Sequence, residues 1–529
     1  MPGLRVTDWF EYTAKTRPQL SFLEMDGRVV RYAEADAWAN RWAQALHAAG
    51  LRIGDRVACL STNSIEMCIL LMAAAKIGVA PLMLNYRLAP REWLGILRDA
   101  EPAAVFARGA QHAAALAALE LDAVSPGMPR VAFDVGAAEL PPGWRALDDW
   151  LAGHPATRPD VQADADDMLY LIYTSGTTGL PKGVMISHTN VVMHVEQSMT
   201  ASPAKKAPGE RALVTTPLYH AAGIHRVVNA AVKGGTVVLL EHFDGPTFVD
   251  TLVRERINSC NMVPSIMQTL LDEIPDLASR DFSQLEVIYY GAAPVSVSLL
   301  KRMMQTFRCH LIQGYGLTES SGGFVYLNEW DHQRALNGDE HLLLSTGQPV
   351  LADVKVVDAE GNNLPPGQPG ELLMRGANVM KGYWRNPAAT AEVLRDGWLH
   401  SGDVAAIDAE GYVYLRDRVK DMIVSGGTNI YPREVENALL EHPAIADAAV
   451  IGVPDPKWGE ALLAVCVARA GHARPDDAAL VAFCRERLGG YKVPRHYSWR
   501  DALPRNPSGK VLKRELRAPY WADQGRGIA

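Results

Sequence analysis

The 529-residue sequence is poor in cysteine, and the cysteines it has are far apart. The six are Cys59, Cys68, Cys260, Cys309, Cys466 and Cys484, and none belongs to a Cys-x-x-Cys pair. This spacing argues against a disulfide framework and against a thiolate zinc site, and it fits a reducing compartment. We therefore expect the protein to be cytoplasmic.

The sequence also lacks an excess of positive charge and a long apolar run. It has 52 Lys and Arg residues against 60 Asp and Glu residues, a net charge of −8. Nucleic acids and anionic membranes require a basic surface, so neither is an expected partner. The most apolar stretch, Met67 to Leu84, is interrupted by Lys76 and Pro81. It is shorter than the ~20 residues of a membrane-spanning helix, and the N-terminus has no signal-peptide core, so we expect no transmembrane segment.

What remains is the composition of a large globular protein, with 48% hydrophobic and 21% charged residues. Residues 56–61 and 80–85 read as strands, and residues 65–77 between them read as a helix closed by Gly78. The alternation continues with strand-like segments at 213–217, 235–241, 259–264 and 286–291. Such alternation is typical of βαβ units and parallel sheets, so we predict an α/β fold with stacked βαβ-type sheets. Thr7 is the predicted cap of the first helix.

The sequence pattern changes at about residue 345, after which short strand-like segments are separated by Gly, Pro and Asp. This pattern predicts antiparallel structure, in the form of a small β-barrel-like subdomain. After residue 420 the chain reads as a small α+β unit. Its predicted elements are a helix that starts at Pro432, strands at 448–454 and 462–468, and a helix at 476–488.

The strongest motif is the segment YTSGTTGLPKG, residues 173–183, which follows the apolar strand MLYLIY. Its glycines remove the Cβ atoms that would keep the chain from wrapping around an anion, and its serine and threonines add hydroxyl donors. Successive backbone N–H groups can form a phosphate-binding nest, and Lys182 adds a positive charge. The order of its residues differs from that of a Walker A loop.

Four further segments carry weaker signals. In GYGLTE, Tyr315 could stack on a base and Glu319 could hold Mg²⁺. In SGD, Asp403 could accept both hydroxyls of a ribose. Residues 416–430 combine dense charge with a Gly-Gly pair, which suggests an exposed, bendable joint. In PRNPSGK, Lys510 could be carried by its loop into the cleft of another domain.

In this order, the five segments resemble those of the adenylate-forming superfamily, which includes acyl-CoA synthetases, nonribosomal-peptide adenylation domains and firefly luciferases. The resemblance covers nearly the whole chain. It implies a large N-terminal domain (1–416), a hinge (417–420) and a smaller, mobile C-terminal domain (421–529). It also implies that ATP and a small carboxylic acid form an acyl-AMP with Mg²⁺, and that coenzyme A then displaces AMP. Dimers occur in the family, so a homodimer is an open expectation.

The resemblance assigns roles to individual residues. The residues that would bind ATP or AMP are Thr174, Ser175, Gly176, Thr177, Thr178, Gly179, Lys182, Gly291, Ala292, Ala293, Gly314, Tyr315, Gly316, Thr318, Asp403, Arg418 and Lys510. Thr174 and Glu319 would be the Mg²⁺ partners, and Lys420 is the hinge position. Lys510 would bridge the carboxylate and the α-phosphate during adenylation. The candidates for coenzyme A are Gly426, Gly427, Trp458, Tyr491 and Arg495.

The acyl pocket is expected near PLYH, residues 217–220. Its candidate residues are His220, Ala221, Ala222, Gly314 and Gly322. Because most of these are small, they leave volume, which favours a medium- or long-chain fatty acid and a role in lipid metabolism. An aryl or alicyclic acid is the alternative, in which His220 contacts the carboxylate; a purely structural role for His220 stays open. A third possibility is delivery of the acyl group to a carrier protein.

Overall fold

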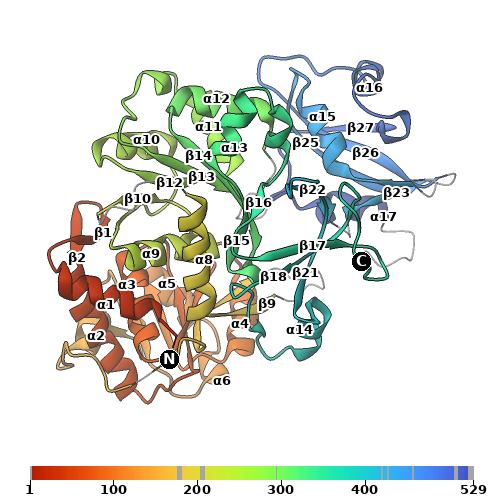
Figure 1. Cartoon of the computed structure of the whole chain (residues 1–529). Coiled ribbons are helices and arrows are strands. Elements are labelled where there is room, and N and C mark those ends of the chain that lie inside the picture. The colour runs from red at the N-terminus through yellow and green to blue at the C-terminus, as the bar shows by residue number, and fades with distance from the viewer. Residues whose placement is uncertain are drawn as a thin grey trace.

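The computed structural model describes residues 3–161, 163–174, 181–202, 209–293, 295–418, 421–425, 428–455, 458–505 and 510–521. Its N-terminal part contains two large sheets (Figure 1). The first has nine described strands in the order β16 (Gln348–Pro349), β15 (Gly322–Leu327), β14 (His310–Leu317), β13 (Val287–Gly291), β12 (Ser259–Met262), β10 (Arg211–Val214), β11 (Thr236–Leu239), β1 (Ser21–Met25), β2 (Arg28–Arg31). The second has eight described strands in the order β19 (Gly382–Tyr383), β9 (Lys182–Ser187), β8 (Met168–Thr174), β4 (Ala80–Leu84), β3 (Arg56–Leu60), β5 (Ala104–Arg108), β6 (Arg130–Phe133), β7 (Arg145–Ala146).

Helices cover both faces of these sheets. One hydrophobic core joins the two sheets through the helices α1 (Val6–Thr16), α2 (Tyr32–Ala48), α3 (Ile65–Lys76), α7 (Leu147–Leu151), α8 (His188–Ala201) and α9 (Ala221–Lys233). A second core packs α10 (Gly245–Arg254), α11 (Pro264–Glu273), α12 (Val297–Phe307) and α13 (Glu329–Leu336) on the other face of the first sheet. A third core packs α4 (Pro90–Ala100), α5 (Gly109–Ala117) and α6 (Leu121–Val124) on the second sheet.

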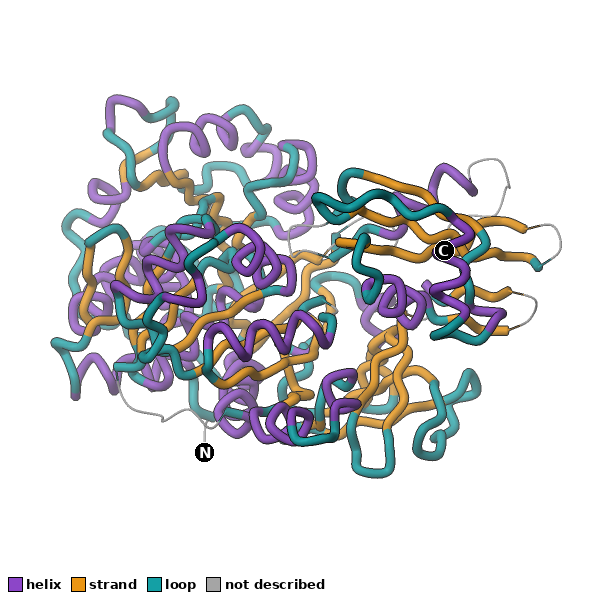
Figure 2. The backbone as a smooth tube through the Cα atoms, turned by 90° about the horizontal axis from the view of Figure 1, so that it is seen from above, coloured by secondary structure: helices purple, strands orange, loops and turns teal. Residues whose placement is uncertain are grey.

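Two smaller sheets follow. The third is antiparallel, with β17 (Asp353–Val357), β18 (Gly370–Arg375), β21 (Trp398–Ile407), β20 (Leu394–Arg395) and β22 (Val413–Arg418), next to α14 (Pro387–Val393). The fourth contains β24 (Thr428–Ile430), β23 (Ile423–Ser425), β26 (Gly459–Ala468), β25 (Ile445–Asp455) and β27 (His496–Arg500), with the helices α15 (Pro432–Leu440), α16 (Asp477–Arg485) and α17 (Lys513–Trp521). In Figure 2 this fourth sheet lies to the right of the large N-terminal part. Short 3-10 turns are η1 (Ala137–Glu139), η2 (Leu277–Ser279), η3 (Thr318–Ser320), η4 (Glu340–Leu344) and η6 (Gly490–Lys492).

The predicted fold class is confirmed: the chain forms a large N-terminal α/β part and a smaller α+β part. Three details differ. The described strands of the third sheet are linked along an open path instead of a closed barrel. The first helix begins at Val6, and the Asp8 carboxylate accepts the backbone N–H of Arg5 at 2.8 Å, so Thr7 is not the cap. The helix expected at 476–488 ends at Arg485. Within the described ranges, we find no helix that is long and apolar enough to cross a membrane.

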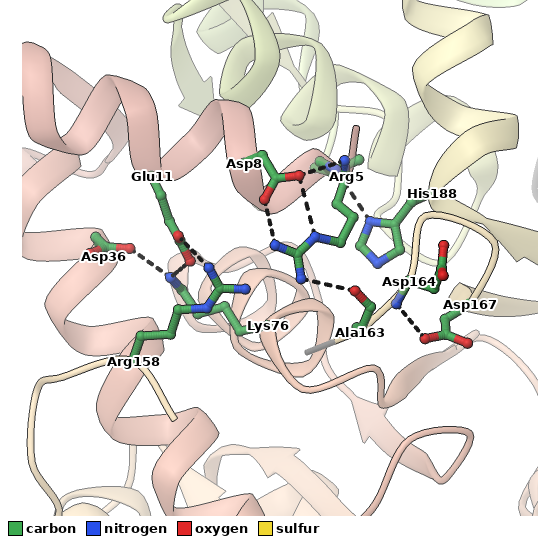
Figure 3. A network of polar contacts seen from close by, with 11 residues as sticks. Arg5, Asp8, Glu11, Asp36, Lys76, Arg158, Ala163, Asp164, Asp167 and His188 are labelled. Atoms are coloured by element: carbon green, nitrogen blue, oxygen red, sulfur yellow. Dashed lines mark hydrogen bonds and ion pairs between the residues drawn. The ribbon is translucent and has the colours of Figure 1, made fainter. Parts of the chain in front are cut away.

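Helix α3 is buried on every side because it lies between the two large sheets. Its last residue, Lys76, has a fully buried side chain. The Lys76 ammonium donates to Glu11 Oε1 at 2.5 Å and to Asp36 Oδ1 at 2.8 Å, and Arg158 pairs with the other oxygen of Glu11 at 2.9 Å (Figure 3). A buried ammonium is expensive unless carboxylates compensate it, so these contacts keep the charge tolerable inside the core.

This arrangement predicts an asymmetry between the partners. The Glu11 and Asp36 side chains retain 23% and 25% exposure, so they can be rehydrated when the lysine is lost, whereas Lys76 cannot. We expect Lys76→Met to change the free energy of unfolding by less than about 1 kcal/mol, and the double change Glu11→Gln with Asp36→Asn to lower it by about 3 kcal/mol. Urea unfolding followed by tryptophan fluorescence compares them. A larger loss for Lys76→Met than for the acid pair would contradict the account.

Candidate active site

A large cleft, about 2290 Å³ in volume, receives residues from all five sequence motifs, with Asp421 as the contribution of residues 416–430. It lies at the carboxyl ends of β8, β13 and β14, where ligands bind in open α/β sheets. The residues assigned to the nucleotide and Mg²⁺ that line it are Thr174, Lys182, Gly291, Ala292, Ala293, Gly314, Tyr315, Gly316, Thr318, Glu319, Asp403 and Lys510. Of the other predicted residues, Ser175, Gly176, Thr177, Thr178, Gly179, Lys420, Gly426 and Gly427 lie outside the described residues.

Glycine is required at the edge of the first sheet because the backbones approach closely there. Gly291 and Gly314 are direct partners on β13 and β14. A Cβ atom on Gly291 would lie 2.3 Å from the Gly314 carbonyl oxygen, and one on Gly316 would lie 1.8 Å from that of Gly322. Both distances are far below van der Waals contact, so a side chain at either position would force the strands apart. The glycines thus keep this edge of the cleft open.

Tyr315 and Asp403 connect the first sheet to the third across the cleft. The Tyr315 hydroxyl donates to Asp403 Oδ2 at 2.6 Å, and the Asp403 side chain is buried. The backbone N–H of Asp403 donates to Ser401 Oγ at 3.0 Å, and the Ser401 hydroxyl donates to the Leu372 carbonyl at 2.6 Å. Along the backbone, Arg418 of the neighbouring strand β22 is the register partner of Asp403. These contacts hold the carboxylate in one orientation beside the base-stacking candidate.

On the opposite side of the cleft, Glu319 is held by a residue that the sequence did not point to. The Tyr383 hydroxyl donates to Glu319 Oε1 at 2.8 Å, and the Lys182 ammonium lies 5.0 Å from the centroid of the Tyr383 ring. Burial and the Glu319 charge raise the pKa of Tyr383, so the phenol stays protonated and keeps donating. Tyr383 is remote from all five motifs, on a two-residue strand, so only the fold brings it here.

The donor set fits Mg²⁺ bound mainly by phosphates. Mg²⁺ usually takes one or two protein carboxylates and completes its shell with phosphate and water oxygens. Glu319 supplies one oriented carboxylate, and Thr174 lines the same cleft at the end of β8. In the ranges that the structure covers, no cluster of three or more His, Cys, Asp or Glu residues could hold a metal without such phosphates.

The acyl-pocket candidates His220, Ala221, Ala222, Gly314 and Gly322 all line this cleft as well. Helix α9 begins directly after His220, which places the first three of them together. Tyr219, from the PLYH segment expected to build the pocket, lines this wall too, whereas sequence reasoning missed Gln313, because it sits in a segment that reads as ordinary core.

Three buried polar atoms in this wall have no hydrogen-bond partner in the described part of the chain: Tyr219 Oη, His220 Nε2 and Gln313 Oε1. Burial lowers the pKa of His220 to about 4, with a further contribution from Arg87, so the imidazole is neutral at pH 7. Burial also raises the pKa of Tyr219 to about 12, so its phenol is neutral too. Buried polar atoms normally have partners, so these three are exceptions that lie on residues lining the cleft.

Two family models match the chain: that of AMP-binding enzymes over residues 10–384 and that of the AMP-binding enzyme C-terminal domain over residues 434–510. The chain belongs to the AMP-binding enzyme family. It is 39% identical to a feruloyl-CoA synthase from Amycolatopsis over 97% of this chain and 98% of that protein. It is 36% identical to the long-chain-fatty-acid–CoA ligase FadD13 of Mycobacterium tuberculosis over 93% of each. Among solved structures, it resembles the o-succinylbenzoate CoA synthetase of Bacillus subtilis in complex with its acyl-adenylate, with a TM-score of 0.80 and 29% identity over 98% of both chains.

In this AMP-binding enzyme, the described candidates for coenzyme A do not line the cleft. The Arg495 guanidinium lies 4.8 Å from the centroid of the Trp458 ring, and the two residues directly precede β27 and β26 of the fourth sheet. Tyr491 is exposed and lies beside Lys492, whose ammonium pairs with Glu434 at 2.6 Å. The structure therefore brings together the nucleotide and acyl candidates and leaves Trp458, Tyr491 and Arg495 apart from them.

The Tyr315–Asp403 bond gives a first prediction. A hydrogen bond to a charged group contributes about 1.5–3 kcal/mol, so Tyr315→Phe should raise the KM for ATP by at least about tenfold while changing kcat less. The matched control is Tyr412→Phe, which removes a hydroxyl that donates to Asp331 Oδ1 at 2.5 Å away from the cleft. Steady-state kinetics with varied ATP distinguish the two. An equal rise in KM for both variants would show a general structural effect.

Buried histidines give a second prediction, on stability. Burial lowers the pKa of His188, His194, His220 and His332 to about 4, and that of His225 well below 6.5. In the unfolded chain these groups take up protons near pH 6.5, while the folded chain resists until about pH 4. The free energy of unfolding should therefore fall as the pH is lowered from 6.5 to 4, by about 1.4 kcal/mol per pH unit for each histidine.

Thermal unfolding midpoints at pH 7.5, 6.5 and 5.5 measure this slope. His332→Gln should reduce the slope of the free energy of unfolding against pH by the contribution of one proton. The reason is that the variant lacks the buried imidazole that bonds the Tyr290 hydroxyl at 2.8 Å. The exposed His472 is the matched position, and His472→Gln should leave the slope unchanged. A midpoint that does not move between pH 7.5 and 5.5 would refute the prediction.

Proposed function

We propose that the carboxylic acid which this ATP-dependent acyl-CoA ligase activates is aromatic. The observation that carries the proposal is the set of unpartnered polar atoms Tyr219 Oη, His220 Nε2 and Gln313 Oε1 on the cleft wall, counted over the described residues. A fatty-acyl chain would leave these buried atoms without a partner, and an unpaired buried polar group costs about 1–3 kcal/mol. An aromatic acid with oxygen substituents offers a flat ring and hydrogen-bonding edges instead.

The shape of the cleft agrees with a flat substrate. Gly291 and Gly314 stand side by side on adjacent strands and carry no side chains, so a ring can lie against their backbones. The similarity to a feruloyl-CoA synthase and to an o-succinylbenzoate CoA synthetase supports the aromatic class, because both enzymes are named after an aryl acid.

The proposed reaction has two steps with different demands on the protein. A carboxylate oxygen first bonds to the α-phosphorus of ATP, and the bond to pyrophosphate breaks. The coenzyme A thiolate then attacks the acyl carbon, and AMP leaves with the electron pair. Because no covalent bond to the enzyme is required, catalysis consists of positioning and charge stabilisation.

Within that scheme, each cleft residue has a proposed role. Lys510, which reaches the cleft from the C-terminal part, would offset the charge that builds up between carboxylate and α-phosphate. Lys182 and Thr174 would contact the outer phosphates, and Asp403, held by Tyr315, would bind the ribose hydroxyls. Mg²⁺ neutralises phosphate charge when bound, and Glu319, oriented by Tyr383, is the carboxylate that would hold it.

A medium- or long-chain fatty acid stays the second candidate. The small residues Ala221, Ala222 and Gly322 leave room beside the cleft, and the chain is also similar to a long-chain-fatty-acid–CoA ligase. The predicted role of the cleft in lipid metabolism belongs to this candidate.

The remaining expectations from the sequence are also kept as proposals. The division into 1–416, a hinge at 417–420 and 421–529 is supported by the separate hydrophobic cores of the fourth sheet. The six cysteines all lie in described residues as free thiols, which suits the cytoplasm. A homodimer rests on the family resemblance alone.

The acid class is tested by pyrophosphate release and thioester formation across a panel of acids, with and without coenzyme A. The panel holds acetate, octanoate, palmitate, benzoate, cinnamate, 4-hydroxycinnamate and two amino acids. We expect the highest kcat/KM on an aryl acid, with turnover that depends on coenzyme A. Turnover on octanoate or palmitate with none on aryl acids would overturn the aromatic proposal. Pyrophosphate release at the same rate with and without coenzyme A would favour a carrier-protein acceptor.

Lys510→Ala is the informative variant in the same assay. Loss of the ammonium should reduce pyrophosphate release by more than about 100-fold for every acid, because charge stabilisation of the first step is lost. Thioester formation from supplied acyl-adenylate should remain largely intact, because the second step does not use that charge. Lys301→Ala, which removes a cation on helix α12 outside the cleft lining, is the control. Equal loss of both half-reactions in Lys510→Ala would contradict the assigned role.

A further inference from the structure

Behind the glycine edge of the cleft lies a second layer of side chains that carry polar groups. Tyr289 and Ile312 precede Gly291 and Gly314 by two residues on β13 and β14, and Asn261 is the partner of Tyr289 on β12. Since side chains alternate along a strand, Tyr289 points to the same face as Gly291, roughly 6.6 Å further from the cleft opening. The two glycines place no side chain between the cleft and this layer.

Tyr326 shows that the layer adjoins the cleft directly. It is the partner of Gly314 on β15, and its ring atom Cε1 would lie 3.4 Å from a Cβ atom built on Gly314. Its hydroxyl donates to the Gly323 carbonyl at 2.7 Å, and Gly323 itself lines the cleft. We call Asn261, Tyr289 and Tyr326, together with Arg226, the inner layer.

Arg226 enters the inner layer from helix α9. Ala222, one turn earlier on the same face of the helix, lines the cleft. The Arg226 guanidinium donates to Asn261 Oδ1 and lies 4.0 Å from the centroid of the Tyr289 ring. The residue is 7% exposed, so the cation is almost entirely removed from water.

What sets Arg226 apart is that no carboxylate pairs with it in the described part of the chain. The structure describes three buried arginine and lysine residues, and two of them, Arg5 and Lys76, form salt bridges with carboxylates. Arg226 forms none among the described residues. Its ionisable neighbours do not compensate it. Burial, together with the charge of Arg226, lowers the pKa of His194 and of His225, so both stay neutral.

A buried, uncompensated cation is costly for a folded protein, and such groups concentrate where a ligand completes them. The fork of N–H donors of arginine suits carboxylate and other oxygen acceptors in particular. The inner layer lies directly behind the cleft-lining residues Ala222 and Gly314 and does not itself line the cleft. It offers what a remote oxygen atom of the substrate requires, namely a charged donor, a neighbouring amide and two phenol rings.

We propose that Arg226 selects the substrate by binding an oxygen acceptor at the end of the aromatic acid remote from the activated carboxylate. The inference rests on the proposed function, because it assumes that the acid lies in this cleft. The ring occupies the space against Gly291 and Gly314, and its distal hydroxyl or carboxylate oxygen meets the guanidinium in the inner layer. A substrate with a hydrocarbon end would instead leave the cation unpaired and exclude its water.

The wild-type enzyme provides the first test, which needs no variant. We compare kcat/KM for thioester formation with cinnamate, 4-hydroxycinnamate, 4-carboxycinnamate and decanoate. Sites built to hydrogen-bond a substrate oxygen strongly reject the analogue that lacks it, so at least one 4-oxygenated acid should exceed both cinnamate and decanoate by about 100-fold or more. The hydroxyl and carboxyl acids distinguish a neutral from an anionic acceptor.

The second test changes Arg226. Arg226→Met keeps much of the length and removes the charge; it should lower kcat/KM for the preferred 4-oxygenated acid by about 100-fold and leave cinnamate unchanged or improved. Arg226→Lys should restore part of the loss with 4-carboxycinnamate, because a point charge replaces the fork. Lys233→Met, which removes a cation from the last turn of the same helix, is the matched control and should alter none of the acids.

The possible outcomes distinguish a failure of the proposed role of Arg226 from a failure of the proposed aromatic substrate class. If the wild-type enzyme uses cinnamate as well as its 4-oxygenated relatives, the role of Arg226 is wrong and the aromatic function stands. If Arg226→Met lowers all acids equally while its thermal midpoint is unchanged, the selective role is likewise overturned. If decanoate is turned over and no aryl acid is, the proposed function itself fails, and the inference fails with it.

Discussion

The close approach of the β13 and β14 backbones at Gly291 and Gly314 is the constraint on which the site depends. With 2.3 Å between the Gly314 oxygen and the position that a Cβ atom on Gly291 would occupy, no other residue fits there without separating the strands. The same pair of glycines opens the end of the sheet toward the acyl side. The next residue of β14, Tyr315, faces the third sheet and holds Asp403. One strand therefore serves both the acyl and the nucleotide parts of the cleft.

Much of this organisation could be predicted because it is encoded locally. Strand–helix alternation indicated the parallel sheets, and glycine-rich segments between strands and helices pointed to the ends of strands, where the fold does gather them. All five motifs reach the cleft although they are spread over more than 300 residues of sequence, because the ends of β8 and β14, the strand β21 and the C-terminal part meet there. The structure places many of their described members in the cleft, and their chemical roles are proposals.

What sequence reasoning missed depends on contacts between distant segments. Tyr383 lies on a strand of two residues, too short for any periodicity to reveal. The residues of the inner layer come together only when four strands pair in the correct register and one helix packs against them. In the sequence alone, Arg226 is simply one charged residue in a predicted helix. For the same reason the small residues at 221, 222 and 322 suggested an apolar tunnel, whereas the structure places a guanidinium and two phenols behind them.

Buried charge has a second consequence in this protein, which concerns helix α3. All twelve of its residues are buried, and most of its surface is uniformly apolar, so hydrophobic packing alone hardly distinguishes one rotation about the helix axis from another. The two charged residues supply that distinction. Glu66 in the first turn accepts a hydrogen bond from Arg28 at 2.6 Å, and Lys76 in the last turn is held by Glu11 and Asp36. The ion pairs at the two ends of α3, one at Glu66 and two at Lys76, fix the rotation of the helix about its axis. They thereby also fix the alignment of the two sheets packed against it.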